Sequence, residues 1–116
     1  MEPKKIIEIK TPEQFEEAII DTKIVFLFKH STASSISADA KQQLETFTIK
    51  HAENKDYTYY IINILENRDL SNLVYDTLKI PHESPQLIVL RNKKVLFHMS
   101  HDAITVDEIE EKLKNV

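Results

Sequence analysis

The 116-residue sequence contains no cysteine and no glycine. Without cysteine, the chain as written has no disulfide, no thiolate metal site and no thiol chemistry of its own. Without glycine, it lacks the glycine-rich loops that bind nucleotide phosphates. Every backbone position with a positive φ must then be occupied by asparagine, aspartate or a strained residue.

Positive charge and long apolar segments are also scarce. The formal net charge of −4 argues against a nucleic-acid partner, because phosphate binding needs a basic face. The longest apolar run, 24–28, is far too short to span a bilayer, and we recognise no secretory signal. We therefore expect a cytoplasmic protein without a membrane partner, and we expect it to act as a monomer.

Local sequence patterns predict alternating strands and helices. Strands are predicted at 6–9, 24–28, 57–64, 86–90 and 95–99. Helices are predicted at 11–21, after 35, from about 69 and from 105. The order β-α-β-α-β-α-β-β-α indicates an α/β protein with early parallel strands, right-handed crossovers and a final antiparallel hairpin. A mixed sheet with helices on both faces is typical of the thioredoxin fold, here as one domain over residues 1–116.

Polar residues mark the expected helix starts and one turn. Thr11 begins a capping box with Gln14, and Thr105 begins another with Glu108. Asp69 or Ser71 is expected to cap the third helix. In the turn at 91–94, Asn92 is expected to adopt the left-handed conformation. The long second helix should bury one apolar stripe, which comprises Ile36, Ala40, Leu44 and Phe47.

The segment from His30 to Ser35 is the first candidate site, because ligands of open α/β sheets bind outside the carboxyl ends of strands. A side chain at Ser34 or Ser35 would face free backbone N–H groups and the positive end of the helix dipole. That placement lowers the pKa of a thiol. A serine hydroxyl does not ionise there, since its own pKa is too high.

The dipeptide Ser84-Pro85, just before the strand at 86–90, is the second candidate. A proline at the start of a covered strand is tolerated only where its missing N–H is not needed. A trans bond is the common state, but the topology favours cis. A cis bond would leave the N–H and C=O of Ser84 free to pair with an extended peptide or a thiol adduct.

Three segments resemble one family. Residues 29–37, KHSTASSIS, are similar to the K-H-S-T-x-C-P-I-S segment of the monothiol bacilliredoxins, a branch of the thioredoxin superfamily. Residues 82–86 resemble that family's H-E-S-P-Q segment, and residues 100–105 resemble its closing S-H-x-x-I-T. The three segments have the same order and spacing as in the family, over nearly the whole chain.

The resemblance implies an enzyme that removes bacillithiol from mixed disulfides on proteins. Its partners would be bacillithiolated proteins, with bacillithiol as a thiol co-substrate and no bound cofactor. The family's single cysteine attacks the bacillithiol sulfur and releases the protein thiol. That cysteine maps onto Ser34, and the proline that follows it maps onto Ser35. Because exchange requires a thiolate, we predict that the chain as written does not turn over.

The expected substrate-binding residues surround position 34; they are Thr32, Ala33, Ser35, Ser84, Pro85, Ser100 and His101. His30 could bias a thiolate or contact a substrate carboxylate, or equally could bond only to backbone. Lys29 is interpreted as a solvated flank. No metal site is expected, because His98 and His101 lack a third convergent ligand.

Two questions stay open at this level. Ser34 could be an engineered replacement or could belong to a natural paralogue, and the intact flanking residues favour engineering. A non-catalytic thioredoxin-like module that binds peptides or thiols in the same groove is the alternative function.

Overall fold

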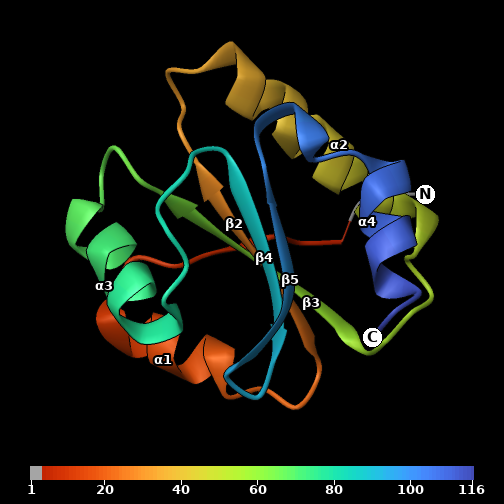
Figure 1. The fold of residues 1–116 in the computed structure, drawn as a ribbon, viewed down its shortest axis with the longest axis horizontal. Coiled ribbons are helices and arrows are strands. Elements are labelled where there is room, and N and C mark those ends of the chain that lie inside the picture. The colour runs from red at the N-terminus through yellow and green to blue at the C-terminus, as the bar shows by residue number, and fades with distance from the viewer. Residues whose placement is uncertain (1–3) are drawn as a thin grey trace.

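A five-stranded mixed sheet forms the centre of the protein, and helices cover both of its faces (Figure 1). The computed structural model describes residues 4–116. In chain order the elements are β1 (Ile7–Glu8), α1 (Pro12–Ile19), β2 (Ile24–His30), α2 (Ser35–Lys50), β3 (Tyr57–Asn63), α3 (Arg68–Leu78), β4 (Gln86–Arg91), β5 (Lys94–Ser100), the 3₁₀ helix η1 (His101–Ala103) and α4 (Val106–Leu113). The predicted order and α/β class are confirmed, with η1 in addition.

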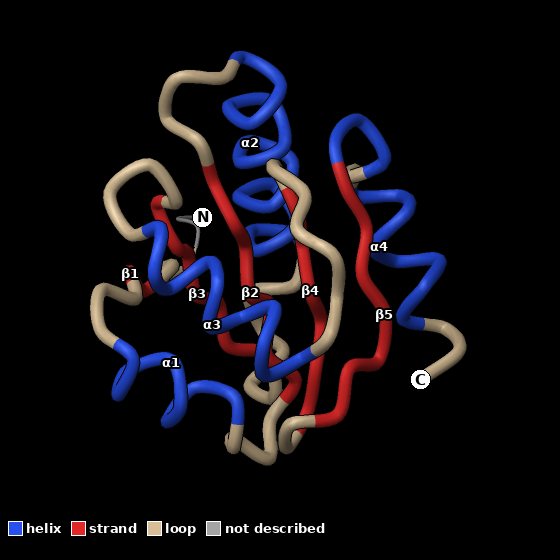
Figure 2. Tube along the Cα trace, turned by 60° about the vertical axis from the view of Figure 1, so that its left-hand side comes forward, coloured by secondary structure: helices blue, strands red, loops and turns tan. Residues whose placement is uncertain are grey.

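The strand order β1-β3-β2-β4-β5 places β2 in the middle of the sheet. β1, β3 and β2 run parallel, whereas β4 runs antiparallel to β2 and to β5. The tube in Figure 2 shows α1 and α3 in front of the sheet and α2 behind it. All seven residues of β2 are buried, which agrees with its unbroken apolar run. Within residues 4–116, no helix is long and apolar enough to cross a membrane.

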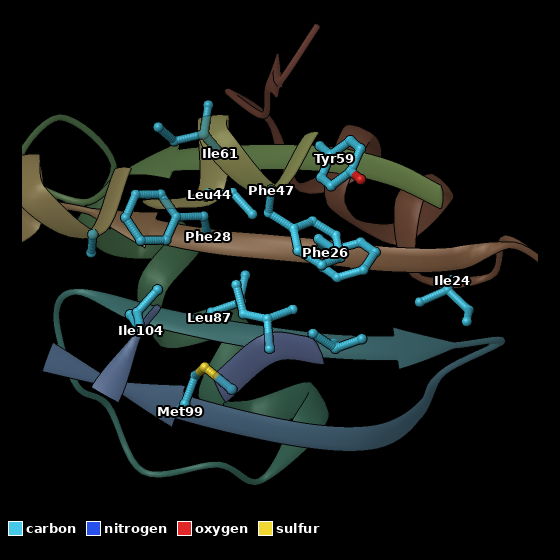
Figure 3. Packing of buried hydrophobic residues seen from close by; sticks show 13 residues of the cluster. Ile24, Phe26, Phe28, Leu44, Phe47, Tyr59, Ile61, Leu87, Met99 and Ile104 are labelled. Atoms are coloured by element: carbon cyan, nitrogen blue, oxygen red, sulfur yellow. The ribbon is translucent and has the colours of Figure 1, made fainter. Parts of the chain in front are cut away.

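The alternation of side chains along β2 divides the core into two layers. Val25 packs on the α1 and α3 side, and Phe26 packs on the α2 and α4 side. Figure 3 shows the second layer, where the ring centroid of Phe26 lies 4.9 Å from that of Tyr59 and 5.3 Å from that of Phe47. These aromatic contacts fix α2 against the central strand, which positions the amino end of the helix.

The helix starts confirm two of the predicted caps and correct the third. Thr11 forms a complete capping box, and the Thr105 side chain accepts the N–H of Glu108. The prediction for α3 was wrong, because Asp69 and Ser71 both lie inside that helix. Its N-cap is Asn67, which makes no side-chain cap bond.

The buried stripe of α2 begins one residue later than predicted. Ala40, Leu44 and Phe47 are buried as expected, but Ile36 is 52% exposed. Ser37 takes the buried position instead; it lies three residues before Ala40 and seven before Leu44, which is the spacing of one helix face. A polar residue therefore lies at the sheet-facing start of the helix.

The glycine-free sequence uses ordinary residues in the left-handed region. Asn92 has φ 48° as predicted, and Lys93, which was not predicted, has φ 67°. Two left-handed residues in succession suit a two-residue hairpin, because their twist matches that of the strands. Lys79 (φ 60°) ends α3, and His101 (φ 56°) begins η1. A side chain with a β-carbon is disfavoured in this region by roughly 1–2 kcal/mol per residue.

Replacement of Lys79 should therefore stabilise the protein. We expect Lys79→Gly to raise the free energy of unfolding by about 0.5–1 kcal/mol, because glycine relieves the left-handed strain at an exposed helix end. Thr77→Gly, two residues earlier inside α3, should instead lower the free energy of unfolding, by roughly 0.3 kcal/mol. Urea denaturation of both variants checks this, and destabilisation by Lys79→Gly would contradict it.

Candidate active site

Residue 34 lies at the amino end of α2, where the chain has just left β2. Ser34 has an extended backbone and is the N-cap; its Oγ accepts the N–H of Ser37 at an N···O distance of 3.2 Å. Ser35 is the first residue of the helix. The side chain of residue 34 therefore meets a backbone donor and the positive end of the helix dipole, an environment that stabilises a thiolate.

The loop before β4 reaches the same end of the sheet (Figure 2). β4 pairs antiparallel with β2, and Gln86 lies opposite Lys29 at the carboxyl end of β2. Pro85, one residue before Gln86, is buried there, and the peptide bond between Ser84 and Pro85 is cis. The antiparallel register thus brings the Ser84-Pro85 segment to the end of the sheet from which α2 departs.

Ser84 is short of hydrogen-bond partners. Its Oγ is buried, and within residues 4–116 that atom has no hydrogen bond. Its backbone N–H and C=O also form no backbone bond within the described chain. Buried polar groups without a partner are uncommon in proteins and call for an explanation, such as a bound molecule. The backbone at Ser84 is therefore available to pair with an extended chain.

The end of β5 borders the Ser84-Pro85 segment. Ser100 lies opposite Gln86, and the backbone N–H of His101 donates to the C=O of Pro85 at 2.9 Å. Nε2 of His101 lies 3.1 Å from a carboxylate oxygen of Glu83, with both side chains about half exposed. These contacts join the end of β5 to the loop before β4. On the other side of Ser34, three exposed residues complete the surface: Thr32, Ala33 and Ser35.

Hydrogen bonds that involve His30 and Ser37 stabilise the first turn of α2. Nδ1 of His30 lies 2.7 Å from Oγ of Ser37, and the same Oγ accepts the N–H of Ser31 at 3.0 Å. Ser37 is fully buried, so its hydroxyl proton needs an acceptor, and Nδ1 of His30 is the acceptor within reach. Burial lowers the pKa of His30, with a smaller contribution from Lys41, which favours the neutral ring. The neutral ring then carries its proton on Nε2.

The sequence reasoning missed Ser37, although a signal was present. A residue three positions after an N-cap is the one whose N–H the cap accepts. His30 does bond to a side chain rather than to backbone, so the purely backbone-bonded alternative is wrong.

The interpretation of Lys29 as a solvated flank is also wrong, because its side chain is fully buried. Its Nζ lies 2.6 Å from Nδ1 of His82 and 3.1 Å from Oε1 of Gln86. Oγ of Ser71 lies 3.1 Å from the same His82 nitrogen. Lys29 points to the α1 and α3 side of β2. Its partners there are His82, from the loop before β4, and Gln86, the first residue of β4, while Ser71 of α3 contacts His82. Tertiary contacts from distant segments therefore make its burial possible.

The five histidines do not converge on a metal ion. In the part of the chain that the structure describes, no group of three histidine, aspartate or glutamate side chains could hold one. His30 and His101 already have partners in Ser37 and Glu83. The groups that surround residue 34 are hydroxyls and backbone amides, which can stabilise an anionic sulfur and bind a peptide backbone.

Burial of Lys29 should make stability depend on pH in the alkaline range. Desolvation lowers the pKa of Lys29 from 10.5 to about 8, opposed by Glu83. At a pH between these two pKa values, the unfolded chain binds more protons than the folded protein. The free energy of unfolding should therefore rise with pH, by up to roughly 1.4 kcal/mol per pH unit. Lys29→Met should remove this rise, and Lys23→Met, at an exposed lysine, should retain it. Denaturation at several pH values measures both, and parallel profiles would contradict the prediction.

Solved structures share this architecture. A protein with a provisional description as an oxidoreductase with a thioredoxin fold is 30% identical, covers 93% of each chain and has a TM-score of 0.84. The thioredoxin of Trypanosoma brucei brucei has a TM-score of 0.74 at 12% identity and covers 96% of this chain and 89% of its own. Mitochondrial thioredoxin 3 of Saccharomyces cerevisiae, in its oxidised form, has a TM-score of 0.74 at 11% identity and covers 96% and 95%. The fold is therefore the thioredoxin fold.

The sequence itself also matches a family model. The model is that of the monothiol bacilliredoxin BrxC, and the match spans residues 7–109. This range contains all three segments on which the resemblance was based, together with position 34 and the Ser84-Pro85 segment. The chain thus belongs to the monothiol bacilliredoxin family, with serine at the position of the family's reactive cysteine.

Proposed function

We propose that the site removes bacillithiol from protein mixed disulfides, and that residue 34 is the position of the attacking sulfur. The observation that carries the proposal is the hydrogen bond from the N–H of Ser37 to the side chain of residue 34 at the start of α2. A sulfur in that place would receive the same donor and the helix dipole, and both lower the pKa of a thiol.

The reaction would be an exchange with no net oxidation. A thiolate at residue 34 attacks the bacillithiol sulfur of the mixed disulfide, and the bond between that sulfur and the protein sulfur breaks. The protein sulfur leaves as a thiolate and takes up a proton from water. Bacillithiol stays bound to residue 34 by the new disulfide until a second thiol attacks it. A serine hydroxyl does not form this bond, because exchange needs a thiolate, so the chain as written is inactive in the proposal.

The substrate chain would lie along the Ser84 side of residue 34. Ser84 offers its backbone N–H and C=O for pairing with an extended segment, since neither forms a backbone bond within the described chain. Pro85 would supply an apolar contact beside it. Ser100 and His101 would complete that rim, while Thr32, Ala33 and Ser35 would surround the sulfur from the exposed side.

A non-catalytic module that binds peptides or thiols in the same groove is the second candidate. The backbone N–H and C=O of Ser84, which form no backbone bond within the described chain, favour binding of an extended chain whether or not residue 34 carries a thiol. The two functions differ only in whether a sulfur at residue 34 reacts with the mixed disulfide. A variant with a thiol at residue 34 therefore distinguishes them.

Ser34→Cys should therefore gain activity. We expect it to release a stoichiometric amount of protein thiol from a bacillithiolated protein and to become bacillithiolated itself, as measured by mass spectrometry of both chains. The unchanged chain should show neither product. Ser35→Cys should be much slower, because residue 35 lies inside the helix and is not the cap. A folded Ser34→Cys protein that leaves the mixed disulfide intact would favour the binding module.

The environment of residue 34 also predicts a low thiol pKa. In Ser34→Cys, we expect the pKa of the thiol to fall clearly below the value of about 8.5 for free cysteine. The reaction rate should consequently level off at a pH below neutral or near it. Lys50→Cys, at the opposite end of α2, should have an ordinary or raised pKa, because the dipole is reversed there. Ultraviolet absorbance of the thiolate against pH measures both, and equal values would contradict the prediction.

A further inference from the structure

A second hollow lies on the other flank of residue 34. A cavity of about 340 Å³ opens between α2 and the β1–β3 edge of the sheet, and its lining includes His30, Thr32, Lys41, Glu45 and Asn63. β3 and β4 pair with opposite edges of β2. The cavity and the Ser84 segment therefore lie on opposite sides of the central strand. The volume suits a small molecule rather than a protein segment.

His30 gives this cavity a hydrogen-bond donor. The ring is only 6% exposed, and Nδ1 is occupied by the hydroxyl of Ser37. The proton of the neutral ring consequently lies on Nε2, which has no hydrogen bond within residues 4–116. An N–H donor in a cavity wall is complementary to an acceptor on a ligand, and a carboxylate is the strongest acceptor.

Two opposite charges complete the wall. Lys41 and Glu45 lie one helical turn apart on α2, are half-buried and form no ion pair within residues 4–116. Lys4 and Glu8 also line the cavity, but each has a partner. Nζ of Lys4 donates to the C=O of Asn54 at 2.6 Å, and Glu8 accepts from the amide of Asn63 at 2.8 Å. Of the two ammonium and two carboxylate groups in the lining, those of Lys41 and Glu45 therefore remain without a side-chain or backbone partner within the described residues.

We propose that this cavity binds the polar part of a small zwitterionic thiol, with a ligand carboxylate on Nε2 of His30 and Lys41 and a ligand amine towards Glu45. This inference rests on the proposed function, in which that thiol is bacillithiol: its malate group carries carboxylates and its cysteinyl group carries an amine. Thr32 lines the cavity and precedes Ser34 by two residues, so a thiol attached to residue 34 could extend into the cavity. The protein substrate would then occupy the opposite, Ser84 side.

The pocket would give residue 34 a preference among thiols. Attraction between the ligand carboxylate and Lys41 adds to the His30 bond in a partly desolvated place, where charge-assisted hydrogen bonds are strong. A thiol with an amine but no carboxylate would have no acceptor for the N–H of His30 and no partner for Lys41.

Titration of the chain as it stands tests the inference, because Ser34 prevents covalent capture. Reduced bacillithiol is added while the ring signals of His30 are followed by NMR. We expect a saturable shift, a weaker one with malate, and none with cysteamine, which lacks a carboxylate. Lys41→Glu should weaken bacillithiol binding at least tenfold, whereas Lys112→Glu, on exposed α4, should leave it unchanged.

The outcomes separate this inference from the proposed function. No shift of His30 at millimolar bacillithiol, or equal binding by the Lys41→Glu and Lys112→Glu variants, would overturn the cavity assignment and leave the Ser34→Cys activity unaffected. Saturable binding together with an inactive Ser34→Cys protein would retain the cavity and reject the reductase.

Discussion

The antiparallel pairing of β4 with β2 is the constraint on which the candidate site depends. It sets Gln86 opposite Lys29 at the carboxyl end of the central strand and so carries the Ser84-Pro85 segment to the end where α2 begins. By itself, the start of α2 provides only backbone N–H donors and the helix dipole. Ser84 by itself provides only a backbone N–H and C=O that form no backbone bond within the described chain. Together they form a place where a sulfur and an extended chain can meet.

Two consecutive residues at the end of β2 hold the two halves of this site. Side chains alternate across a strand, so Lys29 and His30 point to opposite faces of the sheet. Lys29 contacts His82 and Gln86 and fixes the loop before β4. His30 contacts Ser37 and fixes the first turn of α2. The partners of Lys29 come from segments 53 and 57 residues away, whereas the partner of His30 lies only seven residues along the chain.

Serine at residue 34 changes the chemistry of the site without disturbing its geometry. Serine is among the preferred N-cap residues, and its hydroxyl accepts the N–H of Ser37 in the way that a thiolate would. The helix start is therefore retained while the nucleophile is lost. This explains how a chain without cysteine keeps the family's fold and the surroundings of its reactive residue.

The sequence by itself determined the order of strands and helices, the Thr11 and Thr105 caps and the place of residue 34, because these depend on periodicity and on neighbours within a few residues. It did not determine the burial of Lys29 or the exposure of Ile36. Those depend on how α2 rotates against the sheet and on partners from α3 and the loop before β4. The cavity beside His30 likewise exists only in the folded protein, since its walls come from β1, β2, β3 and α2, which meet only when the sheet assembles.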